Sequence, residues 1–369
     1  MSPSKKASLV PPNIEELNPY IPGKTIAEVV DTYQPEQISK LASNENRLGY
    51  SPKVNQAVEN AVKTINDYPD PLSKELRKAI AKRNKVEPSN VIVGSGSESL
   101  LSILCRTFFQ NKQNIITADV TFIGMFVQAK IRGVKLKKIP VTKDYRFDVT
   151  AIANAIDEYT KMIYIANPNN PTGTYINTLE FEWLMKQIPE DIIVIMDEAY
   201  YEYANHVNDY PDVLSYDFKN VVVLRTFSKG YGLAGFRVGY GIGPVDLIGY
   251  MYKTKMAFEP GGIGQAAALA AFQDENFLDQ SIKMVNEGRE ELYQFFEEND
   301  VDYVRSVSNF VLMVFKTEEE AIYLTEKMLE KGVILRRINA FGLPNCIRVT
   351  VGLKHQLAHF MNAYKQIYP

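Results

Sequence analysis

The fold of this chain is decided by the stretch Val221-Val222-Val223-Leu224-Arg225-Thr226-Phe227-Ser228-Lys229-Gly230. Its β-branched first half is typical of a buried strand, and its polar second half is typical of the loop that follows one. Lys229 stands at the exit of this strand, and Arg237 follows eight residues later. The amine can form an imine with an aldehyde, while the nearby hydroxyls and the guanidinium can hold a phosphate. The stretch therefore predicts a site for pyridoxal phosphate (PLP), although a lone lysine near serines is more often an ordinary solvated side chain.

Apolar runs like this one alternate with helical patterns along most of the chain. The predicted strands are Val91-Ile92-Val93, Ile115-Ile116, Met162 to Ala166, Ile192 to Met196, Val221 to Leu224 and Phe236 to Tyr240. Near-continuous apolar strands separated by helices indicate a mainly parallel sheet that is covered by helices on both faces. The sequence therefore predicts the α/β fold class.

A length of 369 residues suggests about two domains. From about Phe277 the pattern changes to that of a smaller α+β unit, which begins with a long charged helix. The strands predicted in this unit are Phe310 to Phe315, Val333 to Leu335 and Ile347 to Val351. We therefore expect a large PLP-binding domain over residues 46–275 and a small C-terminal domain over residues 276–369. Residues 1–45 have too little apolar periodicity to fold alone, and we expect them to pack on the small domain.

Charge and composition exclude several classes of protein. The net charge is −3 with both signs interspersed, which leaves no footprint for nucleic acid or an anionic membrane. The longest apolar runs, Ile192 to Met196 and Ala266 to Phe272, are far too short to span a bilayer, and the first residues do not resemble a signal peptide. Cys105 and Cys346 are too few and too far apart for a disulfide framework. We therefore expect a cytoplasmic protein with small-molecule partners.

Asp197 ends the buried run Ile192 to Met196, where a carboxylate is unfavourable unless it has a partner. A protonated pyridine nitrogen would be such a partner, and the pair would keep the cofactor ring cationic and able to accept electrons. Tyr200, three residues later, is placed to hydrogen-bond the phenolic oxygen of the cofactor. The alternative for Asp197 is a helix cap after a strand, and the sequence leaves both interpretations open.

A second loop at a strand end reads Asn167-Pro168-Asn169-Asn170-Pro171-Thr172-Gly173. Its prolines and glycine fix a rigid loop at the carboxyl end of a strand, where ligands bind in open α/β sheets. Asn170 would donate to the phenolic oxygen from the side opposite Tyr200, and a purely structural turn would not require this full run.

A third loop, Gly94-Ser95-Gly96-Ser97-Glu98, links a predicted strand to an apolar helix. The free amides around Ser95, Gly96 and Ser97 would attract a phosphate, although a plain capped turn looks similar. Phe122 would stack on the cofactor ring, with packing in the core as the alternative.

Two arginines emerge from predicted strands near the C-terminus. Arg348 lies within the apolar run Cys346 to Val351, and Arg336 follows Val333 to Leu335. Arginines in such positions favour an anionic substrate group, which each can hold through two hydrogen bonds. The alternative is an ion pair between elements, and it applies to Arg336 more than to Arg348.

Two further patterns have plainer explanations. Gly230 to Gly235 matches G-x-G-x-x-G, but no acidic residue closes a second strand about twenty residues later, as a dinucleotide site requires. His355 and His359 have helical spacing, but Gln356 stands where a metalloprotease has glutamate. Only His206 remains as a third histidine. We therefore expect neither a dinucleotide nor a metal.

The candidate residues occur in the order and context that is found in the fold-type-I PLP aminotransferases. They are Asn170, Asp197, Tyr200, Lys229, Arg237 and Arg348. Within that family, the chain resembles the histidinol-phosphate aminotransferases. The matching stretches are Tyr20-Ile21-Pro22-Gly23-Lys24, Lys40-Leu41-Ala42-Ser43-Asn44-Glu45-Asn46, Tyr68-Pro69-Asp70, Asp197 to Tyr200, Ser228 to Arg237 and Gly342 to Gly352. They are spread over nearly the whole chain.

The resemblance implies a large domain with a mainly parallel seven-stranded sheet flanked by helices, and a homodimer with its active site at the subunit interface. It implies that Lys229, Asp197 and Tyr200 are catalytic residues. By the same match, Tyr68 reaches the cofactor phosphate of the neighbouring subunit. Phosphate contacts within the subunit would come from Ser95, Gly96, Thr226, Ser228 and Arg237. The anionic end of the substrate would be held by Tyr20, Arg336 and Arg348.

The implied reaction exchanges an amino group between histidinol phosphate and 2-oxoglutarate, which gives imidazole-acetol phosphate and glutamate, a step of histidine biosynthesis. Lys229, once displaced from the cofactor, would act as general base and acid. Two departures bear on the substrate, because Arg47 and Arg337 stand where the family usually has proline. Three alternatives stay open: an aromatic amino-acid (phenylalanine or tyrosine) aminotransferase, a PLP-dependent decarboxylase of a phosphorylated amino acid, and a non-catalytic PLP-binding regulator.

Overall fold

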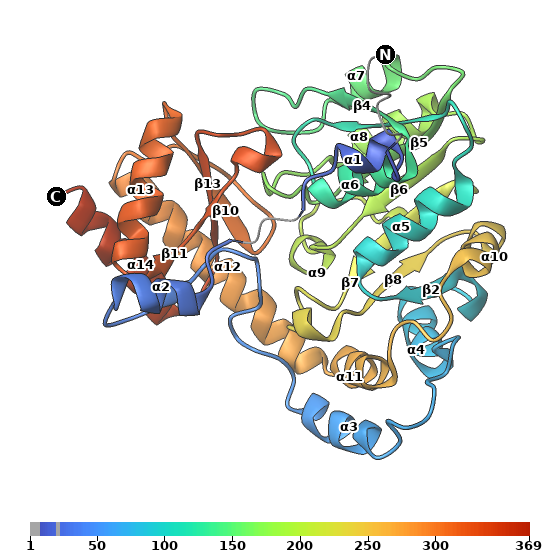
Figure 1. Cartoon of the computed structure of the whole chain (residues 1–369), viewed down its shortest axis with the longest axis horizontal. Helices are drawn as coiled ribbons and strands as arrows, with labels where there is room; N and C mark the ends of the chain where they lie inside the picture. The colour runs from blue at the N-terminus through green and yellow to red at the C-terminus, as the bar shows by residue number, and fades with distance from the viewer. Residues whose placement is uncertain (1–7, 20–22) are drawn as a thin grey trace, which may run out of the picture.

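The computed structural model describes residues 8–19 and 23–369, which form two lobes (Figure 1). The large lobe is built on an open α/β sheet, and the small lobe is built on an antiparallel sheet. A long helix, α12 (Glu275–Glu298), leads from the large lobe into the small one. No helix in the described ranges is long and apolar enough to cross a membrane.

Within the described residues, seven strands form the sheet of the large lobe, in the order β2-β8-β7-β6-β5-β3-β4. Their bounds are β2 (Val91–Gly94), β3 (Asn114–Ala118), β4 (Lys135–Ile139), β5 (Thr160–Ala166), β6 (Ile193–Asp197), β7 (Val221–Thr226) and β8 (Gly239–Ile242). Of these strands, β8 alone runs antiparallel to its neighbours, so the predicted mainly parallel sheet is confirmed. β8 begins later than the predicted strand at Phe236, because Phe236 closes a 3-10 turn and Arg237 takes a positive φ of 53°.

Helices cover both faces of this sheet because its strands alternate apolar side chains between the two faces. On β5, Tyr164 packs in the core beneath α5 (Ser97–Phe108), α6 (Ile123–Arg132) and α10 (Val245–Thr254). Its neighbour Ile163 packs in the core beneath α7 (Val149–Asn154) and α8 (Thr178–Gln187). A third core joins β2 and β8 to α3 (Lys53–Val62), α4 (Lys74–Asn84) and α11 (Gly262–Phe272). Short 3-10 helices occupy Pro88–Asn90, Val213–Ser215, Ala234–Phe236 and Asn339–Phe341.

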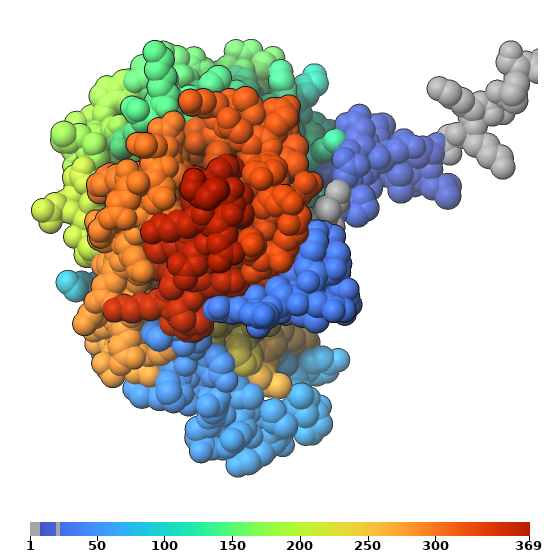
Figure 2. Space-filling model, turned by 90° about the vertical axis from the view of Figure 1, so that its left-hand side faces the viewer, coloured from blue at the N-terminus to red at the C-terminus, as the bar shows by residue number. Residues whose placement is uncertain are grey.

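The small lobe carries a four-stranded antiparallel sheet, counted over the described part of the chain, in the order β12-β13-β10-β9. Its bounds are β9 (Tyr303–Val304), β10 (Phe310–Val314), β12 (Arg336–Arg337) and β13 (Cys346–Thr350). Phe296, Leu324 and Phe360 belong to the core between this sheet and α12, α13 (Glu318–Glu330) and α14 (Lys354–Ile367). Figure 2 shows the outer face of this lobe, where α14 (red) lies between the orange segments of α12 and α13.

The N-terminal segment contacts both lobes. α1 (Pro12–Glu15) lies on α6, where Asn13 Nδ2 donates to the carbonyl oxygens of Lys130 and Ile131 at 3.0 and 3.1 Å. Further along, α2 (Ile26–Tyr33) packs on α13, and β1 (Ser39–Lys40) pairs in parallel with β11 (Val333–Ile334) of the small lobe. Tyr20, a predicted substrate residue, lies outside the described residues.

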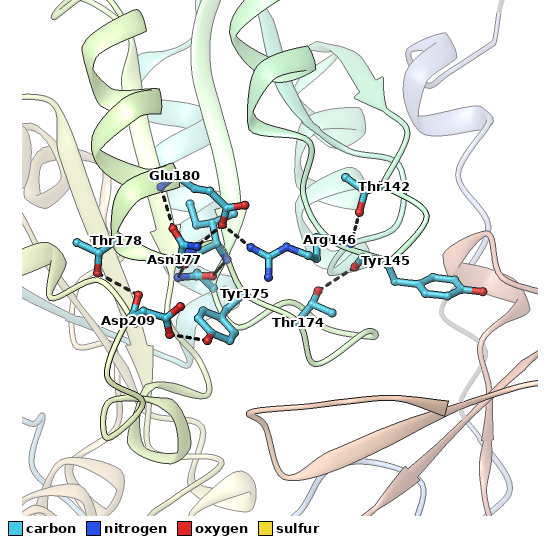
Figure 3. Close-up of polar contacts among 11 residues, drawn as sticks. Thr142, Tyr145, Arg146, Thr174, Tyr175, Asn177, Thr178, Glu180 and Asp209 are labelled. Carbon is cyan, nitrogen blue, oxygen red and sulfur yellow. Dashed lines mark hydrogen bonds and ion pairs between the residues drawn. The ribbon is translucent and has the colours of Figure 1, made fainter. Parts of the chain in front are cut away.

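The loop between β4 and α7 reaches from the large lobe to the small one, and Figure 3 shows Tyr145 projecting from it toward the small-lobe strands. Tyr145 has a φ of 59° and packs on the small-lobe cluster around Leu312. Behind it, Thr174 Oγ1 donates to the Tyr145 carbonyl oxygen at 2.8 Å, and Arg146 pairs with Glu180 at the start of α8. These contacts hold the loop to the large lobe, so Tyr145 links the two lobes next to the candidate site.

Gly173 brings the loop after β5 directly against the small lobe. It has a φ of +77°, and its carbonyl oxygen accepts a hydrogen bond from the Val307 N–H at 2.9 Å. A Cβ at this position would lie 2.1 Å from Ser306 Oγ and 3.1 Å from Ser306 Cα. Both the backbone angle and the space therefore require glycine at the end of the Asn167–Gly173 loop.

We predict that Gly173→Ala destabilises the protein by about 2 kcal/mol or more, because backbone strain and the clash with Ser306 act together. Urea unfolding followed by circular dichroism measures the free energy of unfolding. Gly249→Ala is the matched control, because an added Cβ there, within α10, meets no described atom within 4 Å. That control should gain about 0.5–1 kcal/mol, as alanine does in a helix. Equal free energies for the two variants would contradict the prediction.

Candidate active site

A cavity of ≈ 140 Å³ lies at the carboxyl ends of the parallel strands, where the loops after β2, β5, β6 and β7 meet. Its lining consists of Ser97, Glu98, Phe122, Ala166, Pro168, Asn170, Asp197, Ala199, Tyr200, Thr226, Ser228, Lys229 and Arg237. The fold thus gathers most of the residues that the sequence analysis assigned to PLP, although they are far apart in the chain. A larger groove of ≈ 880 Å³ lies at the other end of β7 and is lined by none of them.

Asp197 ends β6 and is buried against the cavity. Its Oδ2 accepts a hydrogen bond from the Tyr164 hydroxyl at 2.7 Å, and its Oδ1 accepts one from the Ala199 N–H at 3.2 Å. Burial raises the pKa of Asp197 to about 6, and these two hydrogen bonds oppose the rise. The helix that follows, α9 (Tyr201–Ala204), has Tyr200 as its N-cap, so Asp197 is not the cap residue. A cationic partner in the cavity would offset the cost of burying this carboxylate.

Tyr200 is buried, with its ring edge-on to Phe310 of the small lobe at a centroid distance of 5.2 Å. Its hydroxyl oxygen accepts a hydrogen bond from Asn44 Nδ2 at 2.8 Å. Burial raises the pKa of Tyr200, while the charge of Arg348 and the hydrogen bond from Asn44 oppose the rise. The hydroxyl therefore keeps its proton and can donate it to an acceptor in the cavity.

Lys229 lies half-buried in the loop after β7, with Nζ 3.4 Å from the Ser43 carbonyl oxygen. Burial, together with the positive charges of Arg348 and Arg237, lowers the pKa of Lys229 to about 8, and the charge of Glu45 opposes this fall. The neutral amine, which is the nucleophilic form, is therefore accessible close to neutral pH.

Thr226, Ser228 and Arg237 form a group of hydrogen-bond donors beside Lys229. Thr226 Oγ1 donates to Ser228 Oγ at 3.1 Å, and Arg237 Nη1 donates to the same Ser228 Oγ at 3.5 Å. Arg237 Nη2 lies 2.8 Å from the position that a Cβ of Gly96 would take. Glycine at position 96 therefore makes room for the guanidinium, and the donor set suits a phosphate.

Two of the amides predicted to bind the phosphate have partners within the chain. The Ser95 N–H donates to Glu259 Oε1 at 2.9 Å, and the Gly96 N–H donates to the Gly94 carbonyl oxygen at 2.9 Å. Neither Ser95 nor Gly96 lines the cavity itself. The Glu259 carboxylate shows that the Ser95 amide accommodates an anion. Glu259 has no local sequence signal, because it comes from the loop after α10, far along the chain from the glycine-rich turn.

Phe122 and Asn170 approach the cavity from two further loops. The Phe122 ring lies over Gly124, where an added Cβ would be 2.4 Å from Phe122 Cε1, so the glycine gives the ring its place. Asn170 Oδ1 accepts a hydrogen bond from Arg348 Nη1 across the two lobes. The amide group of Asn170 remains as the donor that a phenolic oxygen requires.

Arg336 and Arg348 lie directly opposite each other on the neighbouring antiparallel strands β12 and β13. Directly opposed residues point to the same face of a sheet, and two like charges in these positions are unfavourable. Arg348 is buried, and its Nη2 donates to the Ala42 carbonyl oxygen at 3.0 Å. An anion bound by both guanidinium groups would relieve their repulsion.

The two arginines that replace family prolines do not join this pair. Arg337 follows Arg336 in β12, so it points to the other face of the sheet, where it pairs with Glu318 of α13. Arg47 Nε donates to Gln356 Oε1 of α14 at 3.5 Å. Arg337 therefore has an acidic partner in the small lobe, and Arg47 has a neutral one.

Tyr68 lies away from the cavity of its own chain. Its side chain is 82% exposed, and its ring stacks on Phe258 at a centroid distance of 4.3 Å. Ile65, Leu72 and Met256 are also exposed in the same two segments of the chain. These aromatic and aliphatic side chains expose apolar surface to solvent within the single chain.

Comparisons with known proteins agree with this arrangement. The family model described as aminotransferase class I and II matches residues 36–363. Histidinol-phosphate aminotransferase of Geobacillus sp. (strain WCH70) is 40% identical over 353 residues, which are 95% of this chain and 96% of that protein. The protein of that name from Bacillus subtilis (strain 168) is 38% identical over 346 residues, 93% of this chain and 95% of its own.

Solved structures show the same likeness in three dimensions. Histidinol-phosphate aminotransferase from Sinorhizobium meliloti, in complex with pyridoxal-5'-phosphate, has a TM-score of 0.89 and 25% identity, and the match covers 98% of each chain. A mutant of Thermus thermophilus aspartate aminotransferase has a TM-score of 0.83 at 19% identity, over 98% of this chain and 100% of that one, which shows the common fold.

We predict that Tyr164→Phe raises the pKa of Asp197 above about 6, because the variant loses a hydrogen bond that favours the ionised carboxylate. A bond to a charged group is worth about 1.5–3 kcal/mol, which corresponds to roughly one pKa unit or more. Carbon-13 NMR of the Asp197 carboxyl in the unliganded protein measures the change. Tyr203→Phe is the control, since the Tyr203 hydroxyl bonds Ser281 and should leave the Asp197 titration in place.

The same shift has a consequence for stability. The pKa of Asp197 is raised from 3.8 to about 6 by folding, so the ionised carboxylate lowers the stability of the unliganded protein above that pH. The contribution of Asp197 to the free energy of unfolding should therefore become more favourable as the pH falls from about 6 toward 4.

Proposed function

The chain belongs to the class I and II aminotransferases, and from this premise we propose that it is a PLP-dependent enzyme that transfers the amino group of histidinol phosphate to 2-oxoglutarate. The products are imidazole-acetol phosphate and glutamate. The observation that carries the choice of substrate is the opposed pair of Arg336 and Arg348, which suits a dianionic phosphate. Relatives that bear the name of this activity, at 40% identity over nearly the full length, support the same choice.

The residues around the cavity fit PLP in chemistry. Thr226, Ser228 and Arg237 would hold its phosphate, together with the Ser95 amide, where the phosphate would replace the Glu259 carboxylate. Asp197 would accept a hydrogen bond from the protonated ring nitrogen, and burial of this carboxylate makes a cationic partner favourable. Tyr200 and Asn170 would donate to the phenolic oxygen, and Phe122 would cover the ring. When bound, PLP supplies an aldehyde for the amino group and a ring that withdraws electrons from the substrate α-carbon.

Lys229 performs two tasks in this proposal. Its neutral amine would hold the cofactor by the aldehyde, and the lowered pKa of Lys229 makes this form accessible. With substrate bound, Lys229 Nζ would take the proton from the substrate α-carbon and later return a proton, as general base and then general acid. Tyr200 and Asn170 would hold the cofactor ring in place during this transfer, and Asp197 would keep the ring nitrogen protonated.

Arg336 and Arg348 orient the substrate by its anionic end. Each guanidinium can take separate oxygens of a phosphate, whereas a single carboxylate has fewer oxygens to share between two forks. The hydrogen bond from Arg348 to Asn170 connects this anion site with the cofactor site across the two lobes. The hydrogen-bonded pair Arg348 and Asn170 therefore takes part in both substrate recognition and cofactor orientation.

We further propose a cytoplasmic homodimer in which Tyr68 completes the active site of the neighbouring subunit. Tyr68 is exposed, does not line the cavity of its own chain, and stacks on Phe258. The exposed apolar residues around it form the kind of surface that a subunit contact covers. The buried thiols of Cys105 and Cys346 are both free, which suits a reducing compartment.

We predict that the rate at which PLP attaches to the apoenzyme rises about tenfold per pH unit below pH 8 and levels off above it, because the reacting form is the neutral amine. Stopped-flow absorbance measures the rate, and borohydride reduction with peptide mapping should place the label on Lys229. Arg348→Gln should move the inflection to higher pH, since it removes a positive charge that lowers the pKa of Lys229. A label on a different lysine would end this assignment.

We predict that histidinol phosphate exceeds phenylalanine and tyrosine in kcat/KM with 2-oxoglutarate as acceptor. Arg336→Ala should lower kcat/KM for histidinol phosphate by roughly thirtyfold, or about 2 kcal/mol, and affect the aromatic amino acids less. Arg337→Ala is the matched control, because this neighbour points to the other face and pairs with Glu318. A preference for phenylalanine, or an equal loss on both substrates, would favour the aromatic aminotransferase instead.

A further inference from the structure

A buried ion pair lies directly behind the candidate active site. Glu198 follows Asp197 in the chain, and Arg225 precedes Thr226. Arg225 Nε and Nη2 both lie 2.8 Å from Glu198 Oε2, and the two side chains are 3% and 0% exposed. The mechanism proposed above gives neither residue a part.

The pair occupies the face of the sheet opposite the cofactor residues. Asp197 is two residues after Ile195, and Thr226 is two residues after Leu224, and both apolar residues pack in the core beneath α5 and α6. Side chains alternate along a strand, so Glu198 and Arg225 point to the other side. On that side Arg225 Nη1 donates to Asn84 Oδ1 at 2.8 Å, at the end of α4, and the guanidinium lies 3.3 Å from the centre of the Tyr201 ring.

The ion pair joins the exits of two neighbouring strands. β6 and β7 pair in parallel up to Asp197 opposite Leu224, and the Glu198 N–H donates to the Leu224 carbonyl oxygen at 2.8 Å. Beyond this point the two chains separate into the loops that carry Tyr200 on one side and Lys229 on the other. The contact between Glu198 and Arg225 is therefore the side-chain link at the place where the backbone ladder ends.

The energetic balance of such a pair does not favour a purely stabilising role. Removing two charges from water costs several kcal/mol per ion in general, and well-packed apolar residues often stabilise as much or more. Burial raises the pKa of Glu198 to about 7, with Arg225 opposing the rise, and within the described residues its Oε1 accepts no hydrogen bond. What the pair supplies beyond apolar packing is a fixed position of Glu198 Oε2, because two guanidinium nitrogens converge on this one oxygen. The guanidinium is itself held by Asn84 and by the Tyr201 ring.

We propose that Glu198 and Arg225 are positioning residues for the transamination. From the far face of the sheet, they fix the exit of β6, which carries Asp197, relative to the exit of β7, which carries Thr226, Ser228 and Lys229. The cofactor must contact Asp197 through its ring nitrogen and Lys229 through its aldehyde at the same time. The distance between the exits of β6 and β7 therefore determines how well both contacts are made. The inference rests on the proposed function.

The test is the double variant Glu198→Gln/Arg225→Met, which removes both charges of the pair together. The buried Glu202 loses the charge of Arg225 in this variant, while the charge of Arg83 still acts on it. Urea unfolding gives its stability, tryptophan fluorescence quenching by PLP gives the dissociation constant, and the absorbance of bound cofactor is recorded against pH. We expect a folded protein in which kcat/KM falls by roughly a hundredfold, as a displacement of about 1 Å produces. The dissociation constant of PLP should rise by about tenfold, and the pH at which the cofactor absorbance changes should shift.

The control is Lys327→Met/Glu330→Gln, which removes an exposed ion pair from α13 and should leave kcat/KM, the affinity for PLP and the absorbance titration unchanged. Arg225→Lys is the second variant, for use if the double variant does not fold. It keeps the positive charge but loses the two guanidinium N–H groups that contact Glu198. It should show a smaller loss in the same direction. Wild-type values of kcat/KM, of PLP affinity and of the absorbance titration in a folded variant would overturn the proposal.

The proposed function is tested separately by the wild-type enzyme. If that enzyme forms no glutamate from histidinol phosphate and 2-oxoglutarate, the assignment of the substrate is wrong. The affinity for PLP and the absorbance titration still report on the positioning pair in that case, because they depend on Asp197 and Lys229 and not on the amino donor.

Discussion

The carboxylate of Asp197, held out of water at the end of β6, is the constraint on which the arrangement of the site depends. One hydrogen bond from Tyr164 and one backbone N–H do not restore the hydration that the carboxylate loses, and its pKa rises to about 6 as a result. A cation in the cavity lowers this cost. The surrounding loops place donors for a phosphate and for a phenolic oxygen around the same space, so a ring with a protonated nitrogen at one end and a phosphate at the other satisfies all of them together.

The second requirement is that two lobes meet over this cavity. Arg348 comes from the small lobe, donates to Asn170 of the large lobe and to the Ala42 carbonyl oxygen of the N-terminal segment, and lowers the pKa of Lys229 by its charge. Two further residues link the lobes nearby. Gly173 has no side chain and so allows close approach to Ser306, and the Tyr145 side chain packs on the small-lobe cluster around Leu312. A substrate anion held by Arg348, as proposed, would therefore be positioned by the same contacts that fix the loop carrying Asn170.

Sequence patterns predicted the parts of the site that depend on local structure. Lys229, Asp197 and Asn170 follow apolar strand runs, and parallel strands bring such exits to one edge of a sheet, so their meeting could be predicted. Tyr164 could not, because its contact with Asp197 depends on the pairing of β5 with β6, which apolar runs do not specify. Glu259 reaches the Ser95 amide from a distant loop. The face of the sheet to which Arg337 points could not be predicted either, because β12 has only two residues and shows no periodicity.

The opposed arginines show how stability and binding are connected in this fold. Arg336 and Arg348 face each other across two strands, and within the small lobe this arrangement costs free energy. Asn170 and Ala42 each give Arg348 a neutral hydrogen-bond acceptor. An anion held between the two guanidinium groups would relieve this repulsion. A dianion would relieve more of it than a monoanion, so under the proposed function the opposed pair would favour a phosphorylated substrate.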